Sequence, residues 1–458
     1  MKNFYIKTFG CQMNVRDSEI MVQILRSHGH QPVMDIADAD LILLNTCSIR
    51  DKAEQKVFSL LGQLRDLRQK SANNQDIILA VAGCVAQQEG EKICKRMPDV
   101  RLVVGTQQFY HLPEMVERLE SGQSAREIRC ALAPDFTIPP FQKLFHAGMD
   151  QSGQPLPCPA HDQFKQFVTI MQGCNNFCSY CVVPHTRGRE ISRPVADILE
   201  EVKFYADQGA VEITLLGQNV NSYGTTNQVA DTRVDFADLL YRVAEIDGIK
   251  RIRFTSSNPH DLSDKLMQCF KDIKQLCPHF HLPVQSGSNQ VLKQMNRRYT
   301  RELYLEKVAG LREHCPDIAL STDVIVGFPG ESDQDFAQTM DLLETVRFHA
   351  SFSFKYSDRP HTRSASFTPK VAEPVKKERL QTFQARQDQI SLERNSELVG
   401  SVQEVLVEQI HDQGIQARTG SNHIVHLGPY AHLKTGEFAM ARITRAGMHS
   451  LQADLEST

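Results

Sequence analysis

The stretch QGCNNFCSYCVVP (172–184) holds the tightest group of cysteines in the chain, Cys174, Cys178 and Cys181. Zinc sites usually add a second pair some residues on, but here the next cysteine is Cys269. Ferredoxin-type sites take four thiolates, and this stretch offers three. Three thiolates can bind three irons of a 4Fe–4S cube and leave the fourth iron open, as catalytic zinc keeps an open position. A structural zinc knuckle completed by His185 is the alternative.

The cysteine stretch follows the first of six predicted strands in the middle of the chain. Helical patterns fall between these strands, for instance ADILEEVKFYADQG (196–209). Such alternation predicts a partial parallel (β/α)6 barrel, an α/β fold whose chemistry lies at the carboxyl ends of the strands. LLGQNVNSYG (215–224) and VIVGFPGE (324–331) also fall at such ends. The strands are predicted at 166–171, 211–217, 250–256, 280–284, 319–327 and 351–357.

The N-terminal third shows the same alternation, and three of its strands each end just before a cysteine. These strands are FYIKTFG (4–10), LILLNT (41–46) and ILAVAG (78–83), and VRLVVGT (100–106) is a fourth. In a parallel sheet, Cys11, Cys47 and Cys84 would share the carboxyl edge, where open α/β folds place ligands. Three thiols there predict a second iron–sulfur site, whereas the alternative is that each is a small buried hydrophobe. We interpret the others as packing residues: Cys94, Cys130, Cys158, Cys269, Cys277 and Cys315.

Changes in composition divide the chain into three predicted domains. Residues 1–122 form the first α/β domain, and the proline-rich segment 123–163 is interpreted as a linker. The barrel domain covers 160–392 and ends in a polar helix, 374–395. Residues 395–458 show short β-like runs separated by Gly, Asn and Asp, which predict a small antiparallel β-barrel of about five strands, OB-like in type.

Composition excludes several classes of protein. The chain has 458 residues and a formal net charge of −4, so it is not a polycation that coats nucleic acid by bulk charge. No run reaches the roughly 18 apolar residues of a membrane helix, and MKNFYIKTFGCQMNV (1–15) has no apolar signal core. We therefore expect a cytoplasmic protein, in which thiols stay reduced. Its 12 cysteines then call for an explanation other than disulfides.

The C-x₃-C-x₂-C motif, with Tyr180 before its last cysteine and a barrel strand ahead of it, resembles the radical S-adenosylmethionine superfamily. The resemblance implies that the open iron binds S-adenosylmethionine and that an electron from the cluster yields a deoxyadenosyl radical, which is the cofactor's own chemistry. The resemblance also implies cofactor contacts at later strand ends: Gly217, Gln218 and Asn219 for methionine, Gln285 and Ser286 for ribose, and Val324 to Gly327 for adenine. The alternative is that these glycine-containing stretches are only tight β/α turns.

Longer strings narrow the resemblance to the methylthiotransferases of that superfamily, whose last domain is the RNA-binding TRAM module. Within that family the chain is most similar to the branch that adds a methylthio group to carbon 2 of isopentenyladenosine next to the anticodon of tRNA. The strings are FGCQMN (9–14), NTCSIRDKAEQKV (45–57), GCNNFCSYCVVPHTRGREISRP (173–194), LLGQNVNSYG (215–224), HLPVQSGSNQVLKQMNR (281–297) and STDVIVGFPGE (321–331).

The resemblance implies two 4Fe–4S clusters with different catalytic roles. Cys174, Cys178 and Cys181 would hold the radical-generating cluster, which binds S-adenosylmethionine. The auxiliary cluster, which carries or donates sulfur, would be held by Cys11, Cys47 and Cys84. A radical is needed because no side-chain acid or base removes an aromatic hydrogen near neutral pH. We also expect a tRNA substrate, a flavodoxin or ferredoxin system as electron donor, no membrane partner and a monomeric chain.

Basic patches offer modest support for RNA binding. Residues 396–458 hold four Lys/Arg against seven Asp/Glu, so this domain is not basic. A solvated surface is the alternative meaning of any charge run. The candidate RNA contacts form two patches in the barrel domain: Arg187, Arg189 and Arg193 after the cluster loop, and Arg297 and Arg298 further on. Lys293 and Arg301 extend the second patch.

One loop departs from the family pattern. The family shows Arg-Pro-Gly-Thr-Pro after the last barrel strand, where this chain has SDRPHTRSA (357–365). His361 and Arg363 replace the Gly and the second Pro, which changes the stiffness of the loop.

Other functions remain open from the sequence. Sister enzymes methylthiolate threonylcarbamoyladenosine in tRNA or an aspartate of a ribosomal protein. A protein of another class, a non-catalytic iron–sulfur or RNA-binding protein, could keep the same loops. Each cysteine set would leave one iron of its cluster without a protein ligand. This argues against that class, because an electron carrier needs no open iron.

Overall fold

The computed structural model describes residues 2–48, 51–70, 77–145, 163–226, 234–430 and 432–456. The chain divides into two compact units. Unit 1 comprises Met1–His161, Thr169–Asn175 and Val182–Glu201. Unit 2 comprises Asp162–Val168, Asn176–Cys181 and Val202–Thr458. Cys158, interpreted above as a packing residue, lies outside the described residues.

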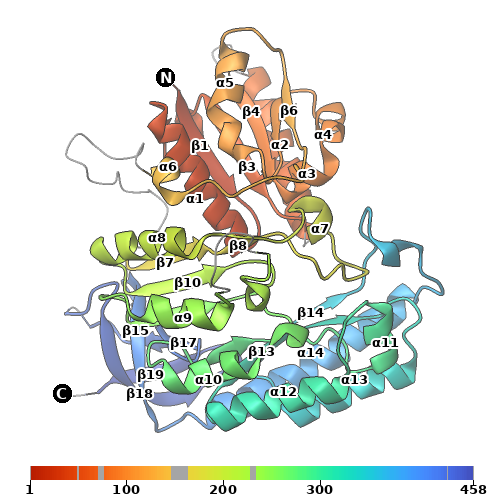
Figure 1. Ribbon diagram of the computed structural model, residues 1–458, viewed down its shortest axis with the longest axis vertical. Coiled ribbons are helices and arrows are strands. Elements are labelled where there is room, and N and C mark those ends of the chain that lie inside the picture. The colour runs from red at the N-terminus through yellow and green to blue at the C-terminus, as the bar shows by residue number, and fades with distance from the viewer. Residues whose placement is uncertain are drawn as a thin grey trace. The chain divides into compact units, whose positions relative to one another are not determined.

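Unit 1 is built on a six-stranded parallel sheet of order β2-β1-β3-β4-β5-β6 (Figure 1). Strands β3 and β4 are buried along their whole length, as expected for a parallel sheet covered by helices. The strands are β1 (Asn3–Thr8), β2 (Gln31–Pro32), β3 (Leu41–Thr46), β4 (Ile78–Gly83), β5 (Val100–Val104) and β6 (Glu127–Arg129). The helices are α1 (Gln12–Ser27), α2 (Asp51–Lys70), α3 (Cys84–Glu89), α4 (Glu91–Arg96), α5 (Leu112–Glu120) and α6 (Phe141–Phe145).

The four strands predicted in the N-terminal third are present as β1, β3, β4 and β5. The two outer strands were not predicted, because two or three residues are too few to show a periodic pattern. β6 pairs with β5 and lies in the segment interpreted as a linker, so the interpretation is wrong for residues 127–129. Unit 1 also contains the short elements β8 (Met171–Gln172), α7 (Val183–Thr186) and β9 (Ile191–Ser192).

All six predicted barrel strands are present, and they form two three-stranded sheets of order β11-β10-β7 and β12-β13-β14. The pairings β10–β11, β12–β13 and β13–β14 are parallel, as predicted. The strands are β7 (Lys165–Thr169), β10 (Glu212–Leu216), β11 (Arg251–Phe254), β12 (His279–His281), β13 (Ala319–Val326) and β14 (Ala350–Lys355). The helices are α8 (Val195–Asp207), α9 (Phe236–Ala244), α10 (Asp264–Asp272), α11 (Asn289–Gln294), α12 (Arg301–His314), α13 (Asp333–Val346) and α14 (Glu373–Ser396).

Polar caps fix where several of these helices begin. Asp235 and Asp238 form a reciprocal capping box at the start of α9, and Ser332 and Asp335 form another at the start of α13. Each box satisfies backbone N–H groups that the first turn of a helix leaves without partners.

The C-terminal strands close into a five-stranded barrel of order β15-β16-β17-β19-β18 (Figure 1). The predicted small barrel is therefore confirmed, although one pairing, β17 with β19, is parallel. Its core is apolar, with Val405, Val407 and Ile443 almost completely buried. The strands are β15 (Val402–His411), β16 (Gly414–Thr419), β17 (Ile424–Leu427), β18 (Phe438–Ala446) and β19 (Leu451–Leu455).

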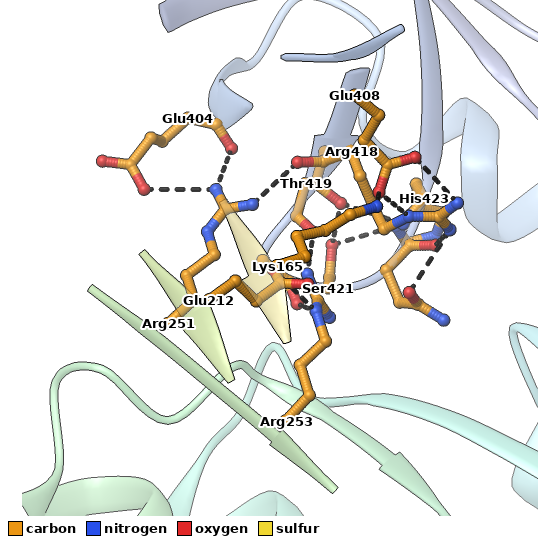
Figure 2. A network of polar contacts seen from close by, with 12 residues as sticks. Lys165, Glu212, Arg251, Arg253, Glu404, Glu408, Arg418, Thr419, Ser421 and His423 are labelled. Atoms are coloured by element: carbon orange, nitrogen blue, oxygen red, sulfur yellow. Dashed lines mark hydrogen bonds and ion pairs between the residues drawn. The ribbon is translucent and has the colours of Figure 1, made fainter. Parts of the chain in front are cut away.

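Within unit 2, a buried polar network joins this C-terminal barrel to the β11-β10-β7 sheet (Figure 2). Arg251 donates to the backbone oxygens of Arg418 (2.8 Å) and Glu404 (2.9 Å). Arg253 donates to those of Gly420 (2.9 Å) and Thr419 (2.8 Å).

Two carboxylates complete the network. Glu408 accepts from Lys165 (2.9 Å) and Arg418 (2.7 Å), and Glu212 accepts from Arg253 (3.0 Å). Burial would raise the pKa of Glu408, but hydrogen bonds and charge from Arg418 and Lys165 lower it to about 2. Lys165, Glu212 and Arg251 are the first residues of β7, β10 and β11. The C-terminal barrel is thus attached to the amino edge of that sheet.

None of the helices in the described part of the chain has the length and apolar character needed to cross a membrane.

Candidate metal centres

The first candidate centre lies at the carboxyl edge of the unit 1 sheet. Cys11 is the N-cap of α1 after β1, Cys47 directly follows β3, and Cys84 opens α3 directly after β4. Since β1, β3 and β4 are neighbours, the structure brings the three predicted ligands to adjacent strand ends. Cys47 and Cys84 are 2 % and 5 % exposed, and Cys11 is half-buried.

Glycine allows these cysteines to approach one another. Gly10 has φ +140°, and a Cβ added there would lie 2.4 Å from the Cβ of Cys47. Gly83 has φ +87°, and a Cβ there would lie 2.3 Å from Oδ1 of Asn45. Any larger residue at either position would push neighbouring loops apart.

Two asparagines, whose role the sequence analysis missed, support the same edge. Asn14 donates to the backbone oxygen of Thr46 (3.1 Å) and accepts from the Cys11 thiol (3.3 Å). Asn45 donates to the backbone oxygen of Asn14 (2.7 Å) and to Ser18 (2.9 Å). A signal for this role was present in the sequence, because Asn14 stands three residues after Cys11 and Asn45 stands two residues before Cys47.

The thiols influence one another electrostatically. A side-chain hydrogen bond with Cys47 lowers the pKa of Cys11 to about 6; burial opposes this shift and the charge of Arg187 favours it. Burial raises the pKa of Cys84, with Arg187 acting against the rise.

We expect the lowered pKa of Cys11 to control its alkylation in the metal-free protein. The thiolate is the nucleophile, so the iodoacetamide rate at Cys11 should be half-maximal near pH 6, constant above it, and lost as the pH falls below it. Cys130 is the matched control, because burial raises its pKa to about 11. Peptide mass spectrometry after timed alkylation gives both profiles. Equal profiles at the two cysteines would contradict the assignment.

The second candidate centre is the loop that carries Cys174, Cys178 and Cys181; Cys174 belongs to unit 1, and Cys178 and Cys181 belong to unit 2. In unit 1, Gly173 has φ +81°, and a Cβ there would lie 2.0 Å from the backbone oxygen of Arg189. The Cys174 N–H donates to the backbone oxygen of Gly188 (3.2 Å). The turn at Gly173 therefore fixes the backbone of Cys174.

In unit 2, the other half of the loop rests on the end of α11. The Ser179 N–H donates to the backbone oxygen of Met295 (3.0 Å), and the Ser179 hydroxyl donates to that of Gln294 (2.8 Å). Arg297 donates to the Cys178 sulfur (3.3 Å) and to the Pro283 backbone oxygen (3.1 Å). Tyr180 packs against the buried cluster of Val291, Met295, Phe328 and Tyr356.

The loop that departs from the family pattern keeps its turn. His361 has φ +65°, the left-handed conformation that glycine adopts most readily, at the position of the family's glycine. Thr362 donates through its hydroxyl to the Arg359 backbone oxygen (2.8 Å), and the Ser364 N–H donates to the Ser179 oxygen (2.9 Å). The substitution therefore leaves the loop in contact with the Ser179 backbone.

The predicted S-adenosylmethionine contacts occupy strand ends, mostly as buried residues. Asn219 is 2 % exposed and donates to Asp261 (2.7 Å), while its Oδ1 has no hydrogen-bond partner within the described residues. Gly217 and Gln218 precede it directly after β10. An unsatisfied buried acceptor beside a strand end fits a cofactor donor such as an ammonium group.

The other predicted cofactor residues lie on β12–β13 and the loops that follow. Gln285 has φ +70° and bridges to Val324, which is 1 % exposed. Ser286 is completely buried. The Gly327 N–H donates to Glu331 (2.8 Å), which fixes the turn after β13. Their roles as ribose and adenine contacts stay predictions.

The five arginines predicted to contact RNA differ in exposure. Arg189 and Arg298 are exposed, and Arg297 is half-buried against Cys178. Arg187 and Arg193 are 3 % and 5 % exposed and bind carboxylates of unit 1. In this arrangement neither guanidinium is available to a phosphate, so the structure gives no support to their predicted RNA contact.

The arrangement of the thiols bears on the kind of metal group that each cysteine set could hold. Among the described residues, no group of three or more His, Cys, Asp or Glu side chains is arranged to hold one metal ion. A cube needs no such convergence, because each thiolate binds a different iron.

Comparisons with known proteins agree with this geometry. Residues 3–105 match an uncharacterized protein family, UPF0004, and residues 168–343 match the radical SAM superfamily. A radical S-adenosylmethionine methyltransferase from Kitasatospora setae, TsrM, superposes with a TM-score of 0.55 at 13 % identity, covering 79 % of this chain and 77 % of that one. This likeness supports the fold alone.

Named relatives match along almost the whole chain. The tRNA-2-methylthio-N(6)-dimethylallyladenosine synthase of Desulfotalea psychrophila is 55 % identical over 456 residues, 99 % of each chain. That of Syntrophobacter fumaroxidans is 48 % identical over 456 residues, 99 % of this chain and 95 % of the relative.

The fold and the thiol sites define a radical S-adenosylmethionine enzyme, whose class uses S-adenosylmethionine and a 4Fe–4S cluster. The chain belongs to the family of tRNA-2-methylthio-N(6)-dimethylallyladenosine synthases.

Proposed function

We propose that this chain is a tRNA methylthiotransferase that adds a methylthio group to carbon 2 of isopentenyladenosine next to the anticodon. The observation that carries the proposal is the pair of three-cysteine sets in a chain with synthases as full-length relatives. One set follows three neighbouring parallel strands, and the other lies in the loop after β8. A non-catalytic iron–sulfur protein would not need two such sets.

The proposal assigns one cluster to each set. Cys174, Cys178 and Cys181 would hold the radical-generating 4Fe–4S cluster, and Cys11, Cys47 and Cys84 an auxiliary 4Fe–4S cluster. When bound, the first cluster and S-adenosylmethionine supply the radical that removes hydrogen from carbon 2, and the auxiliary cluster supplies sulfur.

The chain's own residues would hold and shield these groups. Arg297 orients the Cys178 sulfur, Asn14 orients the Cys11 sulfur, and Gly173 fixes the backbone at Cys174. Asn219 offers its unsatisfied Oδ1 to the methionine end of the cofactor, with Gly217 and Gln218 beside it. We assign Gln285 and Ser286 to the ribose and Val324 to Gly327 to the adenine.

We further propose three functional domains, at 1–122, 160–392 and 395–458, with the last acting as a TRAM-type RNA-binding domain. Arg189 and Arg298 are the exposed arginines that could meet phosphate. The C-terminal barrel is attached to the amino edge of β10, which at about 3.3 Å per residue lies roughly 15 Å from Gly217 at the carboxyl end. RNA touching both places must therefore be longer than a single nucleotide. We expect a cytoplasmic monomer reduced by a flavodoxin or ferredoxin system.

The test is mass spectrometry of tRNA nucleosides from a bacterial strain that lacks its own synthase. Expression of this chain should restore 2-methylthio-isopentenyladenosine, and the Cys174→Ser variant should not. A methylthio group found instead on threonylcarbamoyladenosine, or on a ribosomal-protein aspartate by peptide mass spectrometry of the same cells, would mean that the chain has the activity of a sister enzyme. Absence of every methylthio product from iron-loaded protein would overturn the proposed function.

A further inference from the structure

Arg187 is a buried cation at the first candidate centre. It follows Cys181 by six residues and belongs, with the rest of residues 182–201, to unit 1. Its side chain is 3 % exposed and binds the carboxylate of Asp17 on α1, with Nη2 to Oδ2 at 2.5 Å and Nη1 to Oδ1 at 3.4 Å. Asp17 is equally buried, at 5 %.

The backbone around Arg187 is fixed from the same unit. The Thr106 hydroxyl donates to the backbone oxygen of Thr186, and the Gln107 amide donates to that of Arg187 (3.4 Å). Gly188 has φ +84°, and a Cβ there would lie 2.8 Å from Nε2 of Gln107. Arg187 is therefore held in two ways: Thr106 and Gln107 fix the backbone, and the Asp17 carboxylate fixes the guanidinium.

The fixed guanidinium belongs to the surroundings of these thiols. Arg187 directly follows α7, which packs against α3, the helix that Cys84 opens. Its charge acts on the thiols of Cys84 and Cys11. A guanidinium has five N–H donors, and Asp17 accepts from two nitrogens, so donors remain for sulfur.

We propose that Arg187 is a positioning residue of the auxiliary cluster: its guanidinium, oriented by Asp17, donates to the thiolate ligands and raises the reduction potential of the cluster. The inference rests on the proposed function, which assigns Cys11, Cys47 and Cys84 to that cluster. Hydrogen bonds to cluster sulfurs and net charge set the reduction potential. A cation stabilises the reduced state, which carries one more negative charge.

Stability alone does not account for this arrangement. A buried ion pair recovers little more than its desolvation cost, so an apolar pair would serve the core as well. Unit 1 contains a comparable buried arginine, Arg193, whose partners are Asp197 (2.5 Å) and Glu201 (2.5 Å) rather than thiols. Arg193 is therefore the matched control.

The experiment uses a protein in which Cys174, Cys178 and Cys181 are all replaced by alanine, so that only the auxiliary cluster can form. The reduction potential of this cluster is measured by redox titration monitored by electron paramagnetic resonance. Arg187→Met should lower the potential and shift the iron–sulfur stretching bands in resonance Raman spectra. Arg187→Lys should recover part of the potential, because it keeps the charge. Arg193→Met should leave both readouts unchanged. If Arg187→Met folds poorly, the Arg187→Met/Asp17→Asn double variant leaves no unpaired buried charge and should still show the lower potential.

Two outcomes overturn different parts of the inference. An unchanged potential in Arg187→Met and in Arg187→Met/Asp17→Asn, or an equal fall in Arg193→Met, overturns the role of Arg187 while leaving the cluster in place. A parent triple-alanine protein that binds no iron overturns the auxiliary cluster itself, and with it the proposed function.

Discussion

Replacing Cys174 by serine should reduce formation of 5′-deoxyadenosine to background, whereas replacing Cys47 should leave that cleavage intact and stop methylthio transfer. The reason is the separation of the two cysteine sets along the chain and over different strands. Cys174 follows β8 in the loop of the proposed radical cluster, and Cys47 follows β3 at the edge of the unit 1 sheet.

The measurement combines iron analysis with two product assays. Reconstituted parent protein should bind about eight irons and each cysteine variant about four, as expected for cubes with four irons each. Chromatography of 5′-deoxyadenosine reports radical formation, and mass spectrometry of tRNA reports methylthio transfer. Cys130→Ser in unit 1 and Cys315→Ser in unit 2 are half-buried controls and should keep both activities. Continued S-adenosylmethionine cleavage by Cys174→Ser would mean that the radical site is elsewhere.

Much of the fold could be predicted from the sequence because its strands are regular and apolar. β3 and β4 are buried over their full length, and the cysteines that follow them share an edge for topological reasons alone. β6 could not be predicted in this way, because its three residues, Glu127–Arg129, form a strand only through their pairing with β5. Pairing across a sheet edge leaves no trace in local periodicity.

The polar supports of the site could not be predicted from the sequence. Arg187 and Asp17 are 170 residues apart and meet only in the folded unit. α1 also contradicts the usual rule for charged residues, since Arg16, Asp17 and Glu19 are all buried on it. A patch of arginines after the cluster loop was therefore interpreted as an RNA surface, although two of them bind carboxylates of unit 1. Charge patterns indicate partners of opposite charge, and only the fold shows which partner is present.

The double substitution Arg251→Ala/Arg253→Ala should release the C-terminal barrel from the rest of unit 2. Both arginines are nearly buried, and together they donate to four backbone oxygens at the ends of β15 and β16 and beyond. Their loss leaves those oxygens, and the buried Glu212, without these donors, at a cost of about 3 kcal/mol or more in free energy of unfolding. Calorimetry should show the single unfolding transition of unit 2 split, with the barrel melting first. A glutamate-specific endoproteinase should then cleave after Glu397, between α14 and β15.

The same variant separates attachment of the barrel from chemistry. Three residues of the network in Figure 2, Lys165, Glu212 and Arg251, begin β7, β10 and β11. The residues proposed to bind the methionine end of S-adenosylmethionine instead follow the carboxyl end of β10. Cleavage of S-adenosylmethionine without tRNA should therefore be unchanged, while KM for tRNA rises because the proposed RNA-binding domain is no longer held against the β11-β10-β7 sheet. Arg442→Ala, which removes an exposed ion pair with Glu456 inside the C-terminal barrel, is the control and should change neither quantity. An unaltered KM for tRNA in a double variant whose barrel melts separately would show that the domain binds RNA without being fixed. An unsplit transition would show that the arginines do not hold the domain in place.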